Sequence, residues 1–224
     1  MLFKMRSMSK NIILCVTCLF LTMGYMAMNK KDPLAHYKAK RDLSRSTEPI
    51  GKKIQPSKEK PLFVIQKHDS SRLHYDFRLE IDGVLVSWAV PKGPSTDHKE
   101  KRLAIRTEDH PLDYATFEGV IPQGHYGAGP VMVWDIGTFK NIKEKDGTLV
   151  PLDQCLKNGQ IEVWLEGKKL KGGYALIRMK RKNQWLLIKM KDEYDDARRK
   201  PVNTENKSAL TGKTMHQIEK IAKS

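Results

Sequence analysis

Apolar and polar residues alternate with the period of a β-strand through most of the middle of the chain. The clearest run is residues 74–81, which is followed by the hairpin dipeptide Asp82-Gly83 and by a second run at 84–90. Similar short runs recur at residues 62–66, 102–107, 131–139, 160–166, 173–180 and 184–191. Since no long helical pattern interrupts them, the sequence predicts a mostly β domain, either an antiparallel barrel or a sandwich.

The two ends of the chain differ from this β-rich middle. We expect an apolar extension over residues 1–28, a basic arm over 29–60, the β domain over 61–197 and a basic tail over 198–224. A short helix is possible within residues 33–43. The tail ends in a weakly amphipathic pattern with Met215, Ile218 and Ile221 on one side.

The net charge of +15 is concentrated at the ends. Residues 1–60 carry 13 Lys or Arg against four Asp or Glu, and residues 198–224 carry seven against two, whereas the middle is nearly neutral. Basic ends attract polyanions without sequence preference, although they also simply keep a protein in solution. Nine further Lys or Arg and no acid fall between Lys168 and Lys191, which fits a solvated sheet face or a surface that follows phosphates.

One strand carries a row of ionisable side chains. Successive side chains of a strand point to opposite faces, so His74, Asp76, Arg78 and Glu80 share one face and the apolar residues between them share the other. His74 and Asp76 can converge on a divalent ion, and His68, across the turn, can supply a third ligand while leaving coordination positions open. Arg78 would present its planar guanidinium to a phosphate held there.

Spacing alone does not separate a metal site from a half-buried strand whose His and Asp merely pair. The other polar candidates are open in the same way. His110 follows a strand and precedes a proline, so it fits a catalytic loop or a hydrogen-bonded turn. Lys92 and Arg102 fit phosphate contacts or surface charges. The glycine-rich residues 124–129 lack the order of a dinucleotide-binding fingerprint, and we expect a tight loop beside the site.

Five segments are much more specific together than any one of them alone. They are Phe63-Val-Ile-Gln-Lys-His-Asp-Ser-Ser-Arg-Leu-His-Tyr-Asp-Phe-Arg-Leu-Glu80, Ser87-Trp-Ala-Val-Pro-Lys-Gly-Pro94, Glu108-Asp-His-Pro-Leu-Asp-Tyr114, Glu118-Gly-Val-Ile-Pro-Gln-Gly-His-Tyr-Gly-Ala-Gly129 and Trp185-Leu-Leu-Ile-Lys189. In this order they resemble the 3′-phosphoesterase domain of bacterial ATP-dependent DNA ligase D and its stand-alone relatives. The resemblance runs from about Asp42 to about Asp192 and implies a small antiparallel β-barrel with short flanking helices.

The resemblance also implies an activity and its partners. The activity is Mn²⁺-dependent removal of a 3′-terminal ribonucleotide and then of the 3′-phosphate, which leaves a 3′-OH for non-homologous end joining. The partners are DNA or RNA-terminated DNA 3′ ends, together with a separate DNA ligase and end-binding repair factors. We expect the protein to act as a monomer.

Functional residues of the family correspond to positions of this sequence one by one. The metal ligands correspond to His68, His74 and Asp76, and the essential groups that contact phosphate correspond to Arg78, His110 and Tyr114. Groups that bind substrate or modulate the phosphatase step correspond to Gln66, Lys92, Arg102, Glu108, Asp42 and Glu48. The last two make the arm part of the site. The sequence departs from the family at Gln123, where relatives often have Glu.

Two rival functions stay open. His74 and Asp76 form an H-x-D pair that a distant His110 or His125 could complete into the metal triad of an Fe(II) oxygenase. A non-catalytic nucleic-acid-binding module, held by the basic ends and residues 168–191, predicts salt-sensitive binding without hydrolysis.

The start of the chain allows three interpretations. The uncharged residues 12–28 follow Lys4, Arg6 and Lys10, which is the order of a secretory signal, but no clear cleavage site follows. Seventeen residues are also fewer than the roughly 20 that span a bilayer. We favour a true translation start at Met28 and a cytoplasmic, nucleoid-associated protein, because an enzyme of nucleic-acid ends works where nucleic acid is. Secretion or membrane anchoring stays possible.

Overall fold

The computed structural model describes residues 32–42, 44–51, 60–181 and 183–222. Residues 33–224 belong to one compact unit. The apolar residues 12–28 and the three interpretations of them lie outside the described residues. Within the described ranges, no helix is long and apolar enough to cross a membrane.

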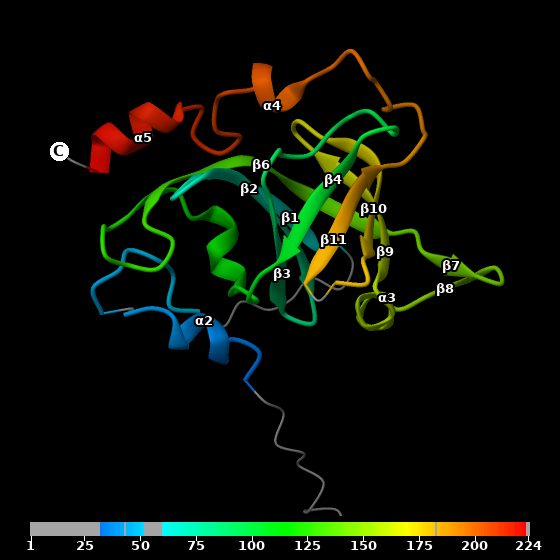
Figure 1. The fold of residues 1–224 in the computed structure, drawn as a ribbon, viewed down its shortest axis with the longest axis horizontal. Helices are drawn as coiled ribbons and strands as arrows, with labels where there is room; N and C mark the ends of the chain where they lie inside the picture. Colours follow the sequence, from blue (N-terminus) through cyan, green and yellow to red (C-terminus); the bar gives the residue numbers. More distant parts are fainter. Residues whose placement is uncertain (1–31, 43, 52–59, 182, 223–224) are drawn as a thin grey trace, which may run out of the picture. The chain divides into compact units, whose positions relative to one another are not determined.

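The fold is a closed antiparallel β-barrel (Figure 1). Its strands are β1 (Leu62–Asp69), β2 (Leu73–Ile81), β3 (Val84–Val90), β4 (Lys101–Arg106), β6 (Gly129–Asn141), β9 (Gln160–Gly167), β10 (Lys171–Arg178) and β11 (Gln184–Lys189). They pair in the order β1-β2-β3-β4-β11-β10-β9-β6, and β6 pairs back with β1 to close the barrel. The predicted barrel with short flanking helices is therefore confirmed.

Smaller elements surround the barrel. The helices are α2 (Ala35–Ala39), the 3₁₀ turn η1 (Leu112–Thr116), α3 (Leu152–Asn158), α4 (Pro201–Thr204) and α5 (Met215–Ala222). The short strand β5 (Gly119–Ile121) extends the sheet beside β6, and β7 (Glu144–Lys145) pairs with β8 (Thr148–Leu149). The sequence did not predict β5, β7 or β8, because two or three residues carry no detectable periodicity.

The alternation of β2 decides which side chains fill the barrel. Tyr75, Phe77, Leu79 and Ile81 point into the main hydrophobic core, as the pattern predicts. The polar residues of the other face are not solvated, however. Asp76, Arg78 and Glu80 are all buried, because further elements cover this side of the barrel.

The covering layer comes from the arm and from η1. Tyr37 of α2 and Leu112 of η1 form a second apolar cluster with side chains that point outward from the barrel, including Val64 and Leu85. Tyr37 and Glu48 are 0% and 3% exposed. Part of the arm is therefore a layer of the fold and not an extended segment. The polar face of β2 lies beneath this layer, and a buried site for charged chemistry results.

The tail also packs onto the barrel. The indole Nε1 of Trp134 donates a hydrogen bond to the carbonyl of Glu205 at 2.6 Å, and the amide of Ala209 donates to the carbonyl of Val133 at 2.9 Å. Ile218 of α5 is buried and Met215 packs against the main core, whereas Ile221, the third residue of the predicted apolar side, is 54% exposed.

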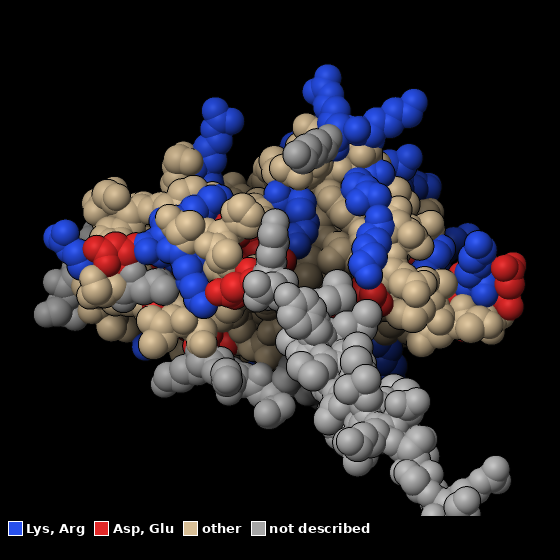
Figure 2. Space-filling view, turned by 90° about the horizontal axis from the view of Figure 1, so that it is seen from below, with Lys and Arg blue, Asp and Glu red and all other residues tan. Residues whose placement is uncertain are grey.

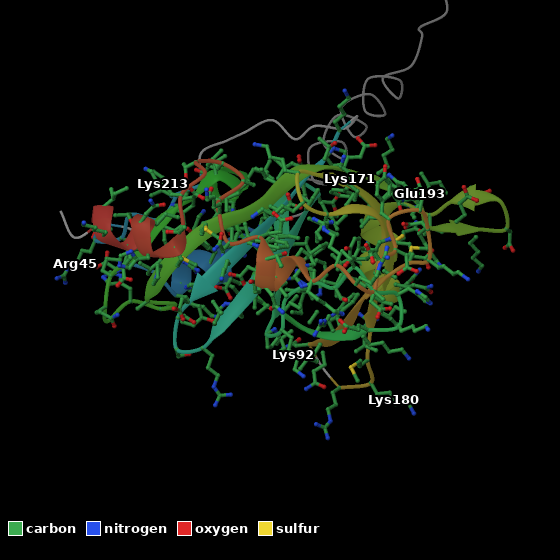
Figure 3. All side chains as sticks on the ribbon, turned by 90° about the horizontal axis from the view of Figure 1, so that it is seen from above. Arg45, Lys92, Lys171, Lys180, Glu193 and Lys213 are labelled. Atoms are coloured by element: carbon green, nitrogen blue, oxygen red, sulfur yellow. The ribbon has the colours of Figure 1, made fainter. Side chains whose placement is uncertain are left out.

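The basic residues 168–191 do not form one surface. Lys189 is buried and pairs with Asp192 at 2.5 Å, whereas Lys168 donates to the tail carbonyl of Ala209 at 2.6 Å. In Figure 3, Lys171 and Lys180 project on opposite sides of the molecule. Figure 2 shows Lys and Arg side chains on several separate parts of one face, with Asp and Glu between them. Lys189 is thus not available to a polyanion, and a phosphate-following role of the exposed basic residues stays a prediction.

Candidate metal centre and phosphate pocket

The β1–β2 hairpin brings the predicted metal ligands together. In its antiparallel register His68 lies opposite His74, and Gln66 lies opposite Asp76. Residues opposite each other in such a ladder point to the same face, so all four side chains project to the same side. β1 extends three residues beyond its predicted end because His68 takes part in this ladder.

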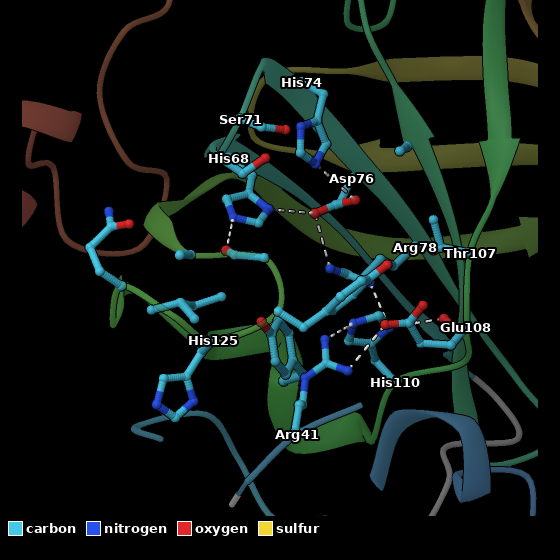
Figure 4. Close-up of a pocket in the computed structure, with 18 residues that line it drawn as sticks. Arg41, His68, Ser71, His74, Asp76, Arg78, Thr107, Glu108, His110 and His125 are labelled. Carbon is cyan, nitrogen blue, oxygen red and sulfur yellow. Dashed lines mark hydrogen bonds and ion pairs between the residues drawn. The ribbon is translucent and has the colours of Figure 1, made fainter. Parts of the chain in front are cut away.

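Backbone carbonyls fix the orientation of both imidazoles. The Nε2 of His68 lies 2.8 Å from the carbonyl oxygen of Gly127, and the Nδ1 of His74 lies 2.8 Å from that of Arg72. A carbonyl only accepts, so these two nitrogens carry the protons. The other ring nitrogens, His68 Nδ1 and His74 Nε2, lie 3.5 and 3.7 Å from the two carboxylate oxygens of Asp76 (Figure 4).

These three residues form a candidate site for a divalent cation. Their ligand atoms all lie within 4.8 Å of one another. Two unprotonated imidazole nitrogens and one carboxylate oxygen are a donor set that first-row divalent metals accept, and the N–H groups bonded to carbonyls are the outer-shell contacts typical of metal-binding histidines. The residues of this structure therefore fit a metal. The third ligand of this group is His68, and not His110 or His125 as in the oxygenase alternative, although two His and one carboxylate are also the donor set of Fe(II) oxygenases.

Arg78 lies beside the carboxylate of this group. Its guanidinium donates to Gln66 Oε1 and Ser87 Oγ at 2.8 Å each, and to Asp76 Oδ2 at 3.1 Å. Burial alone would raise the pKa of the Asp76 carboxyl, but the positive charge of the adjacent Arg78 guanidinium opposes it, and this pKa lies well below its usual range. Asp76 therefore stays ionised, as a metal ligand must.

His110 lies between two guanidinium groups. Its Nδ1 is 2.8 Å from Arg78 Nη1, and its Nε2 is 3.3 Å from Arg41 Nη2. Burial and the positive charges of these two arginines hold the pKa of His110 well below its usual value, so the ring is neutral. A neutral imidazole has one acceptor nitrogen, so it accepts from one arginine at a time.

Arg41 is a site residue that the sequence analysis missed. Its side chain is 4% exposed and bonds to Glu48 Oε1 at 2.8 Å and to Glu108 Oε1 at 3.1 Å. The neighbouring Asp42 is exposed and accepts from Ser44 Oγ at 2.6 Å. The match of the arm to the family included both positions. Arg41 is recognised as a site residue only by its polar contacts with residues outside the arm, and the sequence does not show these contacts.

Two buried side chains hold the site from behind. The amide nitrogen of Gln66 donates to the carbonyls of Tyr114 and Phe117 at 3.1 and 3.0 Å, while its oxygen accepts from Arg78. The hydroxyl of Tyr114 donates to Glu48 Oε1 at 2.9 Å. Burial and the Glu48 carboxylate raise the pKa of Tyr114 well above its usual value, so this hydroxyl stays a donor.

All these groups surround one cavity of about 590 Å³. Seven predicted site residues line it: His68, His74, Asp76, Arg78, Glu108, His110 and Tyr114. Gln66 and Glu48 lie directly behind this lining. Lys92, Arg102 and Asp42 do not line the cavity; Lys92 is exposed beyond β3, and Arg102 pairs with Glu100. Their roles stay predictions.

The glycine-rich loop borders the cavity, as predicted. Gln123 and residues 125–128 line it, and the loop is fixed to His68 through the carbonyl of Gly127. A Cβ on Gly129 would lie 2.0 Å from the carbonyl oxygen of Asp69, so only glycine allows β6 to approach the hairpin this closely.

Comparison with known proteins decides the family. Residues 66–178 match the model of the DNA ligase D 3′-phosphoesterase domain. The chain belongs to this family. It is 51% identical over 172 residues to the multifunctional non-homologous end joining protein LigD of Pseudomonas aeruginosa, which covers 74% of this chain and 19% of that protein. The LigD of Mycolicibacterium smegmatis is 48% identical over 163 residues, covering 72% of this chain and 21% of that protein.

A third LigD, from Mycobacterium tuberculosis, is 46% identical over 164 residues, or 73% of this chain and 20% of that protein. The chain thus spans about a fifth of the length of these curated relatives. The matched residues 66–178 include β2 with Arg78, His110 and the glycine-rich loop, and so most of the side chains that line the cavity.

Proposed function

We propose that this 3′-phosphoesterase-family protein removes a terminal ribonucleotide and then a 3′-phosphate from DNA ends, leaving a 3′-OH for repair by non-homologous end joining. The observation that carries the proposal is that His68 and His74 each place one ring nitrogen against a backbone carbonyl and turn the other toward Asp76, beside two buried guanidiniums. A cation site next to fixed positive charge is suited to a phosphate ester and its transition state.

We assign His68, His74 and Asp76 as ligands of Mn²⁺, with other divalent ions as substitutes. When bound there, such an ion polarises a phosphoryl oxygen and neutralises negative charge. Arg78, held by Gln66 and Ser87, keeps its guanidinium beside that position. This fixed arrangement needs no reorganisation during the reaction.

His110 is our candidate for proton transfer. A phosphate between Arg78 and Arg41 brings negative charge to the two groups that depress the pKa of His110, so this pKa rises when substrate binds. Once Arg41 Nη2 turns to the phosphate, His110 Nε2 is free to hold a proton and pass it to the leaving oxygen.

Water is the proposed nucleophile. Ser70 and Ser71 line the cavity, but among the described residues neither hydroxyl has a hydrogen bond to a histidine that could activate it. Tyr114 keeps its proton and points it at Glu48, so we assign it a positioning role.

The decisive experiment uses an end-labelled primer–template with a single 3′ ribonucleotide. With Mn²⁺ we expect loss of the ribonucleoside, then of the phosphate, and a product that a polymerase extends. A chelator should abolish both steps. Salt-sensitive binding that survives His68→Ala and His74→Ala, with no hydrolysis under any divalent ion, would instead support the non-catalytic nucleic-acid-binding module.

We also propose the substrates, the partners, the oligomeric state and the location of the protein. DNA or RNA-terminated DNA 3′ ends are the proposed substrates, and a separate ligase and end-binding factors are the proposed partners. We propose a monomer in the cytoplasm, associated with the nucleoid. Size-exclusion chromatography of the purified protein and the N-terminal mass of the native protein test the last two statements.

A further inference from the structure

Tyr126 combines exposure with a fixed position at the cavity. Its side chain is 50% exposed and lines the same cavity as Asp76 and Arg78. Tyr194, at 43%, is the other exposed aromatic side chain in the described part of the chain, but it packs near Trp164 and does not line this cavity. The proposed function does not yet give this exposed ring at the cavity a ligand to bind.

The loop holds Tyr126 close to the metal group. Gly127, the next residue, bonds to the ring of His68, while His125, the preceding residue, lies on the side of the cavity away from His74 (Figure 4). Positive φ angles at Gly124 and Gly127, +85° and +77°, allow the loop to turn at both places. Tyr126 thus directly precedes the residue whose carbonyl contacts the metal-ligand candidate His68.

Cations from the arm fix the ring itself. Lys40 Nζ lies 4.4 Å from the ring centroid and 3.2 Å from the hydroxyl, and it also pairs with Glu108 at 3.0 Å. The guanidinium carbon of Arg41 lies 5.6 Å from the same centroid. These contacts already restrict the motion of the ring. The ring therefore loses less conformational entropy when a ligand binds, which favours binding.

We propose that Tyr126 is a nucleobase-binding subsite, on which the base of the nucleoside that carries the 3′-phosphate stacks. This inference rests on the proposed function. A nucleotide has a phosphate, which the cation group and the arginines suit, and a flat base, which an exposed aromatic ring suits. Stacking tolerates every base because each has a π face, so the subsite would accept 3′ ends of any sequence.

Two variants and two substrates test the subsite. The substrates are a primer ending in an ordinary nucleoside 3′-phosphate and the same primer ending in an abasic 3′-phosphate. We expect wild type to show a KM about tenfold lower for the ordinary end, and Tyr126→Leu to lose this preference with kcat within about twofold of wild type. Tyr126→Phe, which keeps the ring and loses only the hydroxyl bond to Lys40, should keep the preference.

The control is Tyr194→Leu, which removes an exposed ring elsewhere and should match wild type. The subsite is refuted if Tyr126→Leu keeps the preference for a base. It is also refuted if Tyr126→Phe and Tyr126→Leu are equally impaired, because the hydroxyl would then matter and not the ring. Equal loss of kcat on both substrates would show that Tyr126 acts only through Lys40 and Glu108.

A binding measurement separates this proposal from the proposed function. A primer with 2-aminopurine at its 3′-phosphorylated end, mixed with protein and chelator, reports stacking without turnover. Quenching by wild type and Tyr126→Phe, but not by Tyr126→Leu, would support the subsite even if hydrolysis were absent. Hydrolysis without any quenching or base preference would retain the proposed function and remove the subsite.

Discussion

His68 and His74 lie opposite each other in the β1–β2 ladder, with ring centroids 4.8 Å apart. Their spacing is set by hydrogen-bonded backbone and not by flexible loops, so the cation site inherits the rigidity of the barrel wall. If one of the two strands slipped by one residue in this register, its histidine would turn to the opposite face, away from the other ring.

The first prediction concerns the ligands. His74→Ala should weaken Mn²⁺ binding by more than about tenfold and abolish turnover, because it removes one of three donors. The barrel should stay folded by circular dichroism, since His74 is not part of the hydrophobic core. Titration calorimetry with Mn²⁺ checks the change, and the exposed His216 provides the control variant His216→Ala. Unchanged affinity in His74→Ala would refute the metal assignment.

The second prediction concerns Arg78. Arg78→Lys keeps the charge but cannot bond to Gln66, Ser87 and Asp76 together, so kcat/KM should fall about a hundredfold or more. Arg178→Lys, at an exposed position on β10, serves as control. Steady-state kinetics on a 3′-phosphorylated primer measures both. Near wild-type kinetics for Arg78→Lys would mean that point charge alone suffices.

The third prediction concerns Arg41. Arg41→Met should lower activity about a hundredfold, because it removes one of the two guanidiniums beside His110. It should also lower the free energy of unfolding by about 3 kcal/mol, since the buried carboxylates of Glu48 and Glu108 lose a partner. Urea unfolding and primer kinetics measure the two effects. Arg45→Met, in the exposed part of the arm, should change neither.

The fourth prediction concerns pH. The pKa of His110 is depressed in the folded protein, so below about pH 6.5 the unfolded chain binds a proton that the folded chain does not. The free energy of unfolding should therefore fall as pH decreases from 7.5 to 5. His110→Gln should show a shallower decrease in urea unfolding. An identical slope in the two proteins would mean that His110 titrates normally in the fold.

The sequence predicted correctly which side chains of the β1–β2 hairpin share a face, because the alternation of a strand is a local pattern. Alternation in β2 and the turn before it place His74, Asp76 and Arg78 on one face, and His68 follows from the ladder. The closure of the barrel and the burial of this face could not be predicted in the same way. Both depend on contacts between segments far apart, such as Tyr37 with η1, that no local pattern encodes.

The arm and the loops were the harder part of the site. Arg41 and Tyr126 lie in segments without periodicity. Their importance for the site follows from contacts with residues far away in the sequence. Gln66 shows the reverse case: the family match named it, and the structure gives the reason, because its amide joins Arg78 to the carbonyls of η1. A family match identifies the position of such a residue, whereas its contacts in the fold explain what the side chain does.

The ligand hairpin has a consequence for how the centre comes into being. His68, His74 and Asp76 fall within nine consecutive positions, so closing one turn brings the three side chains near one another. The Gly127 carbonyl that orients His68, and the phosphate-binding groups Arg41 and His110, lie outside this hairpin and must wait for longer-range contacts. Local pairing therefore gathers the ligands early in folding, and the rest of the chain fixes their final geometry.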